Sequence, residues 1–198
     1  MADDIYNRAE RRPGTRQGPL TGVRVADFCW MGVGSLATRF LADFGAEVIK
    51  IENRLRLDTP RRLPIYKGRT RSYGEEDPTP DPNAGGLHNN YSRNKLGITV
   101  NMKTPEGREI VDRLIAASSV VTENFAPGVM ERWGLTYDRI STLSPDAIFA
   151  RMSGFGHSGP YEHFRSYGPV VQAACGLSFI SGLPGQPPSG WGLSYMDN

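Results

Sequence analysis

Two parts of this sequence carry residues whose types and spacing could do chemistry. The first is the turn Trp-Met-Gly-Val-Gly at residues 30–34, which lies between a strand-like apolar run and a helical run. Open α/β sheets bind nucleotide-like ligands at such turns. The second is Asp197, the next-to-last residue. Free aspartate side chains have a reference pKa of about 3.9, so a carboxylate of this kind is ionised at neutral pH and needs no histidine to attack a carbonyl.

The turn leaves two other interpretations open. A dinucleotide-binding pattern needs a third glycine three residues after Gly34, where the sequence has Ala37. Glu52, near the end of the next apolar run, could nevertheless hold a ribose. A nicotinamide-dependent oxidoreductase is therefore one alternative. A tight turn that uses glycine only for its backbone angles is the other.

The composition limits the classes of function. A chain of 198 residues with 38% hydrophobic content and a formal charge of +2 can form one sizeable core and is not drawn strongly to nucleic acid. Cys29 and Cys175 lie far apart without metal-ligand spacing, so we expect no metal site and reduced thiols in a cytoplasmic protein. We also expect no membrane association or export signal, because the sequence has no long apolar run.

Strand-like and helix-like segments alternate around these residues. Apolar runs predict strands at 23–28, 48–51, 98–101, 120–123 and 148–152. Helical spacing predicts helices at 35–44, from 104 onward, at 128–133 and at 137–143. Ser35 and Thr104 are the expected N-caps of the first two helices. The buried stripe of the second helix is expected to comprise Ile110, Val111, Leu114 and Ile115. This alternation predicts an α/β fold with a Rossmann-like, doubly wound, mostly parallel sheet.

Two regions lack this periodicity. Residues 1–18 are polar and charged and contain Pro13 and Gly14, so we expect a flexible N-terminal arm before a domain at residues 19–198. Residues 54–94 combine a basic run with an acidic, proline-rich run, which predicts a long surface loop.

Several segments resemble the class III CoA-transferases, the family of formyl-CoA transferase, carnitine CoA-transferase and related acyl-CoA racemases. They read GVRVADF, LADFGAEVIKIE, RNKLGITVNMKTPEGREI, VTENFAPGVMERWGL and SGFGHSGP. In this family an aspartate about 30 residues after a Tyr-Asp or Tyr-Glu pair is the covalent nucleophile. Tyr167 and Asp197 have that separation, so the resemblance implies that Asp197 is the catalytic residue.

The same resemblance implies a binding site for coenzyme A. The positions that look like CoA contacts are Met31, Val100, Lys103, Asn124, Phe125, Arg132 and Arg165. Lysine and arginine can pair with the phosphates of CoA, while phenylalanine and asparagine can pack on and hydrogen-bond its adenosine or pantetheine. CoA and acyl-CoA act as substrates in this family, so we expect no tightly bound cofactor and no metal.

Two positions depart from the family pattern. Gly168 stands where formyl-CoA transferase has an acidic residue and where racemases complete a His-Asp pair. Tyr167 lacks a base that titrates near neutrality, so racemisation is a less favoured alternative. Gly32 stands where formyl-CoA transferase has a glutamine.

Members of the family are longer than this sequence, with a second domain after the nucleophile and two interlocked protomers. We therefore expect an N-terminal half with an incomplete sheet, either a fragment or one subunit, that associates through exposed apolar surface. The expected function is transfer of CoA from an acyl-CoA donor to a carboxylic acid acceptor. The alternative is a noncatalytic CoA-binding subunit of a heteromer; otherwise the full protein would be an interlocked homodimer.

Overall fold

The computed structural model describes residues 17–61, 82–83, 85–189 and 195–197. The expected N-terminal arm at residues 1–18 thus lies almost entirely outside the described residues. A helix long and apolar enough to cross a membrane does not occur among the residues described.

Five parallel strands form one sheet in the order β3-β2-β1-β4-β5. The strands are β1 Arg24–Asp27, β2 Glu47–Glu52, β3 Leu96–Thr99, β4 Val120–Glu123 and β5 Ile148–Arg151. Val25 of β1 lies between Val48 of β2 and Val120 of β4. This order and direction confirm the predicted Rossmann-like α/β fold.

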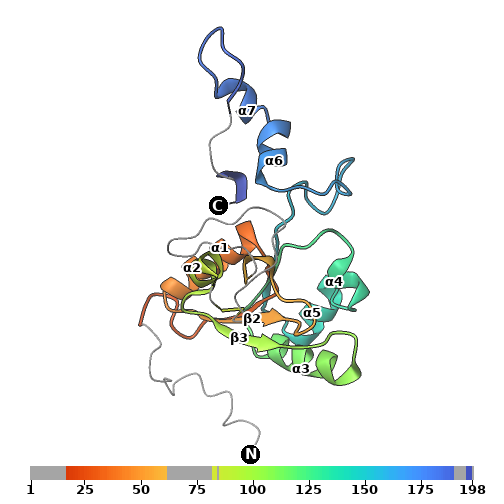
Figure 1. Ribbon diagram of the computed structural model, residues 1–198. Helices are drawn as coiled ribbons and strands as arrows, with labels where there is room; N and C mark the ends of the chain where they lie inside the picture. The colour runs from red at the N-terminus through yellow and green to blue at the C-terminus, as the bar shows by residue number, and fades with distance from the viewer. Residues whose placement is uncertain (1–16, 62–81, 84, 190–194, 198) are drawn as a thin grey trace, which may run out of the picture.

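Helices cover both faces of the sheet (Figure 1). One face is covered by α1 Gly32–Asp43 and α2 Gly86–Ser92, the other by α3 Pro105–Ala116, α4 Val129–Arg132 and α5 Tyr137–Leu143. The larger core lies under α3 to α5 and includes Phe28, Val111 and Met130. A smaller core under α1 contains Val25, Ala42, Ala46 and Val48. Because both faces are covered, the central strands carry buried apolar residues on both sides of the sheet, such as Val25 in the smaller core and Ala26 in the larger one.

The start of α3 was predicted correctly. The Thr104 hydroxyl accepts a hydrogen bond from the Gly107 N–H at 3.1 Å, and Pro105 occupies the first helical position. The expected membership of Ile110 in the buried stripe was wrong, because this side chain is 49% exposed. Gly107, Val111 and Ile115 face the core, which turns Ile110 toward solvent.

The predicted start of α1 was also wrong. The helix begins at Gly32 with Met31 as its N-cap, and Ser35 is a buried residue inside it. The Ser35 hydroxyl donates to the Cys29 carbonyl at 3.2 Å. A Cβ atom at Gly34 would lie 2.5 Å from Cys29 Sγ. Glycine at position 34 thus lets the turn pack closely against the helix. Because of this packing, the helix begins three residues before Ser35, at Gly32.

Other boundaries differ for similar tertiary reasons. β3 begins at Leu96, two residues before the predicted strand, because residues 96–99 pair with residues 49–52 of β2. The expected loop at 54–94 contains the 3-10 helix η2 Thr59–Arg61 and α2.

Three further helical elements were not predicted. They are α6 Gly168–Ala174, α7 Leu177–Ile180 and the 3-10 helix η3 Tyr195–Asp197. Figure 1 shows that α6 and α7 project away from the sheet and its covering helices.

Candidate functional site

The carboxyl ends of β1 and β4 meet where the strand order changes direction. From β1 the order runs outward to β2 and β3 on one side and to β4 and β5 on the other, and open α/β sheets bind ligands at such a point. Asn124 connects the segment after β4 to the turn after β1. Its Oδ1 accepts from the Trp30 N–H at 2.8 Å, and its Nδ2 donates to the Trp30 carbonyl at 2.7 Å. Asn124 therefore fixes the backbone before Met31, and it keeps one hydrogen and one lone pair for a ligand.

Phe125 is the centre of an aromatic group at the same edge. Its ring meets those of Trp30 and Trp133 edge-on, with centroid separations of 5.7 Å and 5.4 Å. The Phe125 N–H donates to Glu123 Oε2 at 2.7 Å, and Arg151 Nε lies 2.9 Å from Glu123 Oε1. Edge-to-face pairs fix ring orientation, so Phe125 offers a firmly held, half-buried apolar surface.

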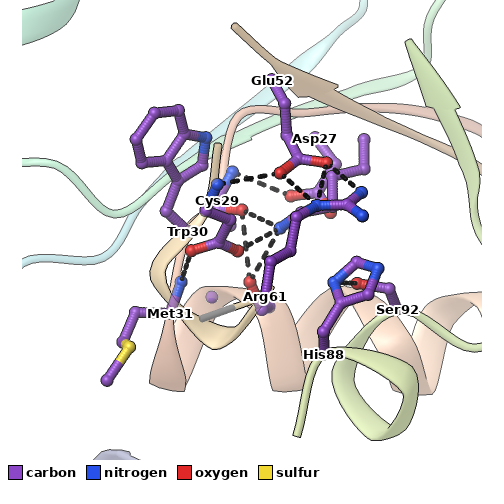
Figure 2. Close-up of polar contacts among 12 residues, drawn as sticks. Asp27, Cys29, Trp30, Met31, Glu52, Arg61, His88 and Ser92 are labelled. Atoms are coloured by element: carbon purple, nitrogen blue, oxygen red, sulfur yellow. Dashed lines mark hydrogen bonds and ion pairs between the residues drawn. The ribbon is translucent and has the colours of Figure 1, made fainter. Parts of the chain in front are cut away.

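Met31 has a backbone conformation that residues other than glycine rarely adopt. Its φ is 54° and its ψ is −154°. Such a conformation costs about 1–3 kcal/mol and persists only where surrounding contacts impose it. Asn124 holds the preceding residue, and Asp58 Oδ1 accepts a hydrogen bond from the Met31 N–H at 2.9 Å (Figure 2). The turn is thus held in one strained shape from two sides.

A layer of buried charges lies beneath α1, and local sequence patterns did not reveal it. The register places Asp27 of β1 beside Lys50 of β2, and both side chains are buried. Asp27 Oδ2 lies 3.0 Å from Lys95 Nζ, and Lys50 Nζ lies 2.8 Å from Asp58 Oδ2. Burial lowers the pKa of Lys95, and the Asp27 carboxylate offsets only part of this effect. The available signal was the lysine inside the apolar run of β2.

Glu52, which could hold a ribose in a nicotinamide enzyme, is engaged by internal partners. Its Oε1 accepts from the Asp58 N–H and from Arg61 Nε, both at 2.9 Å, and its Oε2 accepts from Arg61 Nη2 at 2.5 Å (Figure 2). Burial raises the pKa of Glu52, but these hydrogen bonds outweigh burial and leave the pKa below its ordinary value. Glu52 therefore anchors the segment at 58–61, which disfavours a ribose-binding role.

Asp197 lies in η3, beside the first turns of α1 and α6. Its Oδ1 accepts a hydrogen bond from the Gly168 N–H at 2.8 Å. A Cβ atom at Gly168 would lie 2.7 Å from Asp197 Oδ2, and one at Gly32 would lie 2.8 Å from Asp197 Cβ. Both separations are shorter than real Cβ contacts. Gly32 and Gly168, the two positions that depart from the family pattern, therefore leave the space that Asp197 occupies.

The other predicted CoA contacts are more scattered. Val100 follows β3 and is buried in the larger core, so its side chain packs internally. Lys103, Arg132 and Arg165 are exposed and lie before α3, in α4 and before α6. None of these three forms an ion pair with another described residue. Exposed cations of this kind suit flexible phosphate groups.

Two other groups bear on chemistry. His157 Nε2 lies 3.3 Å from Glu123 Oε1, so this loop histidine packs beside the end of β4. Burial raises the pKa of the Cys29 thiol well above its ordinary value, which leaves the thiol protonated and unreactive. Among the described residues there is no group of three or more side chains that could hold a metal ion.

Comparisons with known proteins give the family. Residues 20–198 match the sequence pattern of CoA-transferase family III. The chain is similar to succinyl-CoA–D-citramalate CoA-transferase of Chloroflexus aurantiacus, with 38% identity over 91% of this chain and 42% of the relative. It is also similar to the succinyl-CoA–L-malate CoA-transferase beta subunit of the same organism, with 34% identity over 86% of this chain and 39% of the relative.

A solved structure agrees with these relatives. A CAIB/BAIF family protein from Brucella suis superposes with a TM-score of 0.79 and 31% identity, over 92% of this chain and 46% of that protein. The chain thus spans less than half the length of the relatives that it matches. On the family match, the relatives and the fold together, this chain belongs to the CoA-transferase family III.

Proposed function

We propose that this chain supplies the CoA-binding edge and the nucleophile of an enzyme that transfers CoA from an acyl-CoA donor to a carboxylic acid. Family membership supports the reaction class. The observation that carries the assignment of residues is the position of Asp197 beside Gly32, the residue that follows Met31. The proposed nucleophile and the proposed CoA-binding turn are therefore neighbours, although they lie far apart in the sequence.

In the proposed reaction, an oxygen of the Asp197 carboxylate attacks the thioester carbonyl of the donor. The C–S bond breaks, which leaves a mixed anhydride and CoA thiolate. The thiolate then attacks the aspartyl carbonyl, releases the donor as a carboxylate and forms an aspartyl-CoA thioester. Each of these steps exchanges one activated acyl group for another, so the reaction balances without an oxidant or a nucleoside triphosphate.

The acceptor acid reverses this sequence. Its carboxylate attacks the aspartyl thioester, releases CoA thiolate and forms a second anhydride. The thiolate attacks the acceptor's carbonyl, which yields the new acyl-CoA and restores Asp197. Backbone N–H donors stabilise the oxyanions that develop in such steps, and the Gly168 N–H already donates to Asp197 Oδ1 at 2.8 Å.

The geometry of the edge supports the proposed CoA-binding roles. We assign the apolar surface of Phe125 and the remaining hydrogen-bond capacity of Asn124 to the adenosine or pantetheine. The exposed side chains of Lys103, Arg132 and Arg165 are assigned to the phosphates. Val100 and Met31 contribute backbone atoms and the shape of the edge, because the Val100 side chain is buried and the Met31 backbone is held in a strained conformation.

The substrates and partners are proposals as well. Two relatives are named for succinyl-CoA as donor, so we propose succinyl-CoA for this enzyme. One relative is named as a subunit, and large apolar side chains on α6 and α7 are exposed. We therefore propose an assembly with a second chain, identical or different. A reducing, cytoplasmic location is proposed from Cys29 and Cys175, which are both free thiols.

Trapping of the acylated aspartate tests the function. The chain is incubated with succinyl-CoA and then with hydroxylamine, and the modified peptide is found by mass spectrometry. We expect modification at Asp197, its loss in Asp197→Ala, and its persistence in Asp112→Ala, a control that removes a partly exposed surface carboxylate. CoA binding without any adduct at Asp197 would favour a noncatalytic subunit instead.

A further inference from the structure

We propose that Asp58, held by Lys50, is a positioning residue that sets the start of α1 against Asp197. This inference rests on the proposed function, since it concerns the step in which Asp197 is acylated. It draws on contacts that run from β2 through one strained turn to the nucleophile.

Lys50 is the first link. Its side chain is 2% exposed, and Nζ donates to the Cys29 carbonyl at 2.7 Å, to Ser35 Oγ at 3.3 Å and to Asp58 Oδ2 at 2.8 Å. All three ammonium hydrogens therefore have acceptors. Lys50 thus ties together the residue at which the turn begins, the first turn of α1 and Asp58.

Asp58 is the second link, and it is held at both ends. Its carboxylate accepts from Lys50 through Oδ2 and from the Met31 N–H through Oδ1, at 2.8 Å and 2.9 Å. Its own N–H donates to Glu52 Oε1 at 2.9 Å. Because Glu52 is anchored in β2, Asp58 cannot shift independently of the sheet. It is therefore a rigid acceptor for the amide of Met31.

Met31 and Gly32 are the last links. The backbone of Met31 has a φ of 54°, and the next residue packs against Asp197 so closely that a Cβ atom at Gly32 would lie 2.8 Å from Asp197 Cβ. A residue other than glycine leaves this conformation when nothing imposes it. Loss of the Asp58 acceptor would therefore move Gly32 relative to Asp197. A displacement of about 1 Å can cost about 100-fold in rate.

Stability alone does not account for the pair. Buried ion pairs are often no more stabilising than apolar side chains of the same volume. Asp58 Oδ1 also accepts a hydrogen bond from the N–H of Met31, whose backbone is strained and which precedes the residue packed on Asp197. The ion pair therefore has a second role, which is to hold this turn. That role depends on the acceptor oxygen and not on the charge.

Two matched double variants separate these roles. Lys50→Met/Asp58→Asn and Lys50→Met/Asp58→Leu both remove the two buried charges of this ion pair, and Asn and Leu have similar shapes. Only Asn keeps an oxygen acceptor for the Met31 N–H. Both variants lose the contacts of Lys50, so the comparison is between them: we expect the Asn variant to acylate Asp197 with succinyl-CoA about 10- to 100-fold faster than the Leu variant. CoA affinity should fall by a smaller factor than the acylation rate in the Leu variant, because Met31 is only one of the proposed CoA contacts and Asn124 and Phe125 are unaltered.

A second measurement is independent of acylation. Hydrogen exchange of the Met31 amide should be slow in the unaltered chain and in the Asn variant, and faster in the Leu variant, which has no acceptor for it. Asp43→Asn is the control on the same helix. It removes the ion pair with Arg93 at the far end of α1, where Arg93 Nη2 lies 2.6 Å from Asp43 Oδ2, and should leave acylation unchanged.

The outcomes are distinguishable. Equal acylation rates and equal exchange in the Asn and Leu variants would overturn the inference. If the unaltered chain is never acylated at Asp197, the proposed function fails, while the exchange of the Met31 amide still decides whether Asp58 holds the turn. The two variants are also compared in a Met31→Gly background. Glycine adopts this backbone conformation freely, so there the difference in rate between Asn and Leu should shrink, and an undiminished difference would contradict the inference.

Discussion

The sheet region and the α6–η3 region are held together by different means. The sheet has a core on each face and buried charges that are paired beneath α1. In α6 and α7 only Gly168 and Gln172 are buried, and Phe179 and Ile180 are 79% and 73% exposed. The proposed CoA-binding edge is therefore built by the sheet itself. The proposed nucleophile depends on a segment that has little core of its own.

The largest expected effect concerns the buried charges of the sheet. Lys95→Met leaves the buried Asp27 carboxylate without its ion-pair partner, so we expect a loss of about 3–5 kcal/mol in the free energy of unfolding, measured by urea denaturation. Arg93→Gln removes an ion pair whose arginine is exposed, and should change the same quantity little. Equal effects of the two substitutions would show that the buried layer does not hold the sheet region.

The second prediction concerns the space around Asp197. Gly168→Ala would place a Cβ atom 2.7 Å from Asp197 Oδ2, so we expect acylation of Asp197 to slow by about 10- to 100-fold. Gly97→Ala is the matched control, because a Cβ atom at Gly97 meets nothing within 4 Å. An undiminished rate in Gly168→Ala would mean that Asp197 reacts from a different position.

The third prediction concerns the exposed apolar surface. Replacing Phe179 and Ile180 by serine should weaken self-association or binding of a second chain, as measured by sedimentation at several concentrations. The free energy of unfolding of the sheet region should change by less than about 0.5 kcal/mol, because both side chains are exposed. Unchanged association would argue against α7 as a contact surface.

The smallest effect is a pH dependence within the sheet region. The pKa of Glu52 lies below its ordinary value of 4.5 in the folded chain. Its contribution to stability is therefore fully present above that value and is lost as the pH falls through the folded-state pKa. Glu52→Gln should be less stable than the unaltered chain at pH 7, and this difference should narrow as the pH falls below about 4.5. Urea denaturation at several pH values would show a constant difference if Glu52 made no such contribution.

Local signals were sufficient for much of the sheet region. The bounds Val120–Glu123 and Tyr137–Leu143 were predicted correctly from apolar runs and helical spacing, and Thr104 was recognised as an N-cap from its own side chain and the proline that follows. Such signals depend only on neighbouring residues.

Other features depend on tertiary contacts, which local patterns do not contain. The strained φ of Met31 follows from Asp58 and Asn124, and the start of α1 follows from the packing of Gly34 on Cys29. For the site, the sequence indicated Asp197 through a family resemblance. It could not show that Asp197 packs against Gly32, because these two residues lie far apart in the sequence.

A crystal structure of the protein with bound CoA tests the central claim most directly. We predict that the CoA sulfur lies about 3–3.5 Å from a carboxylate oxygen of Asp197, with the nucleotide end of CoA at the edge formed by Asn124 and Phe125. An Asp197 side chain that points into solvent, or a CoA molecule bound away from this edge, would contradict it.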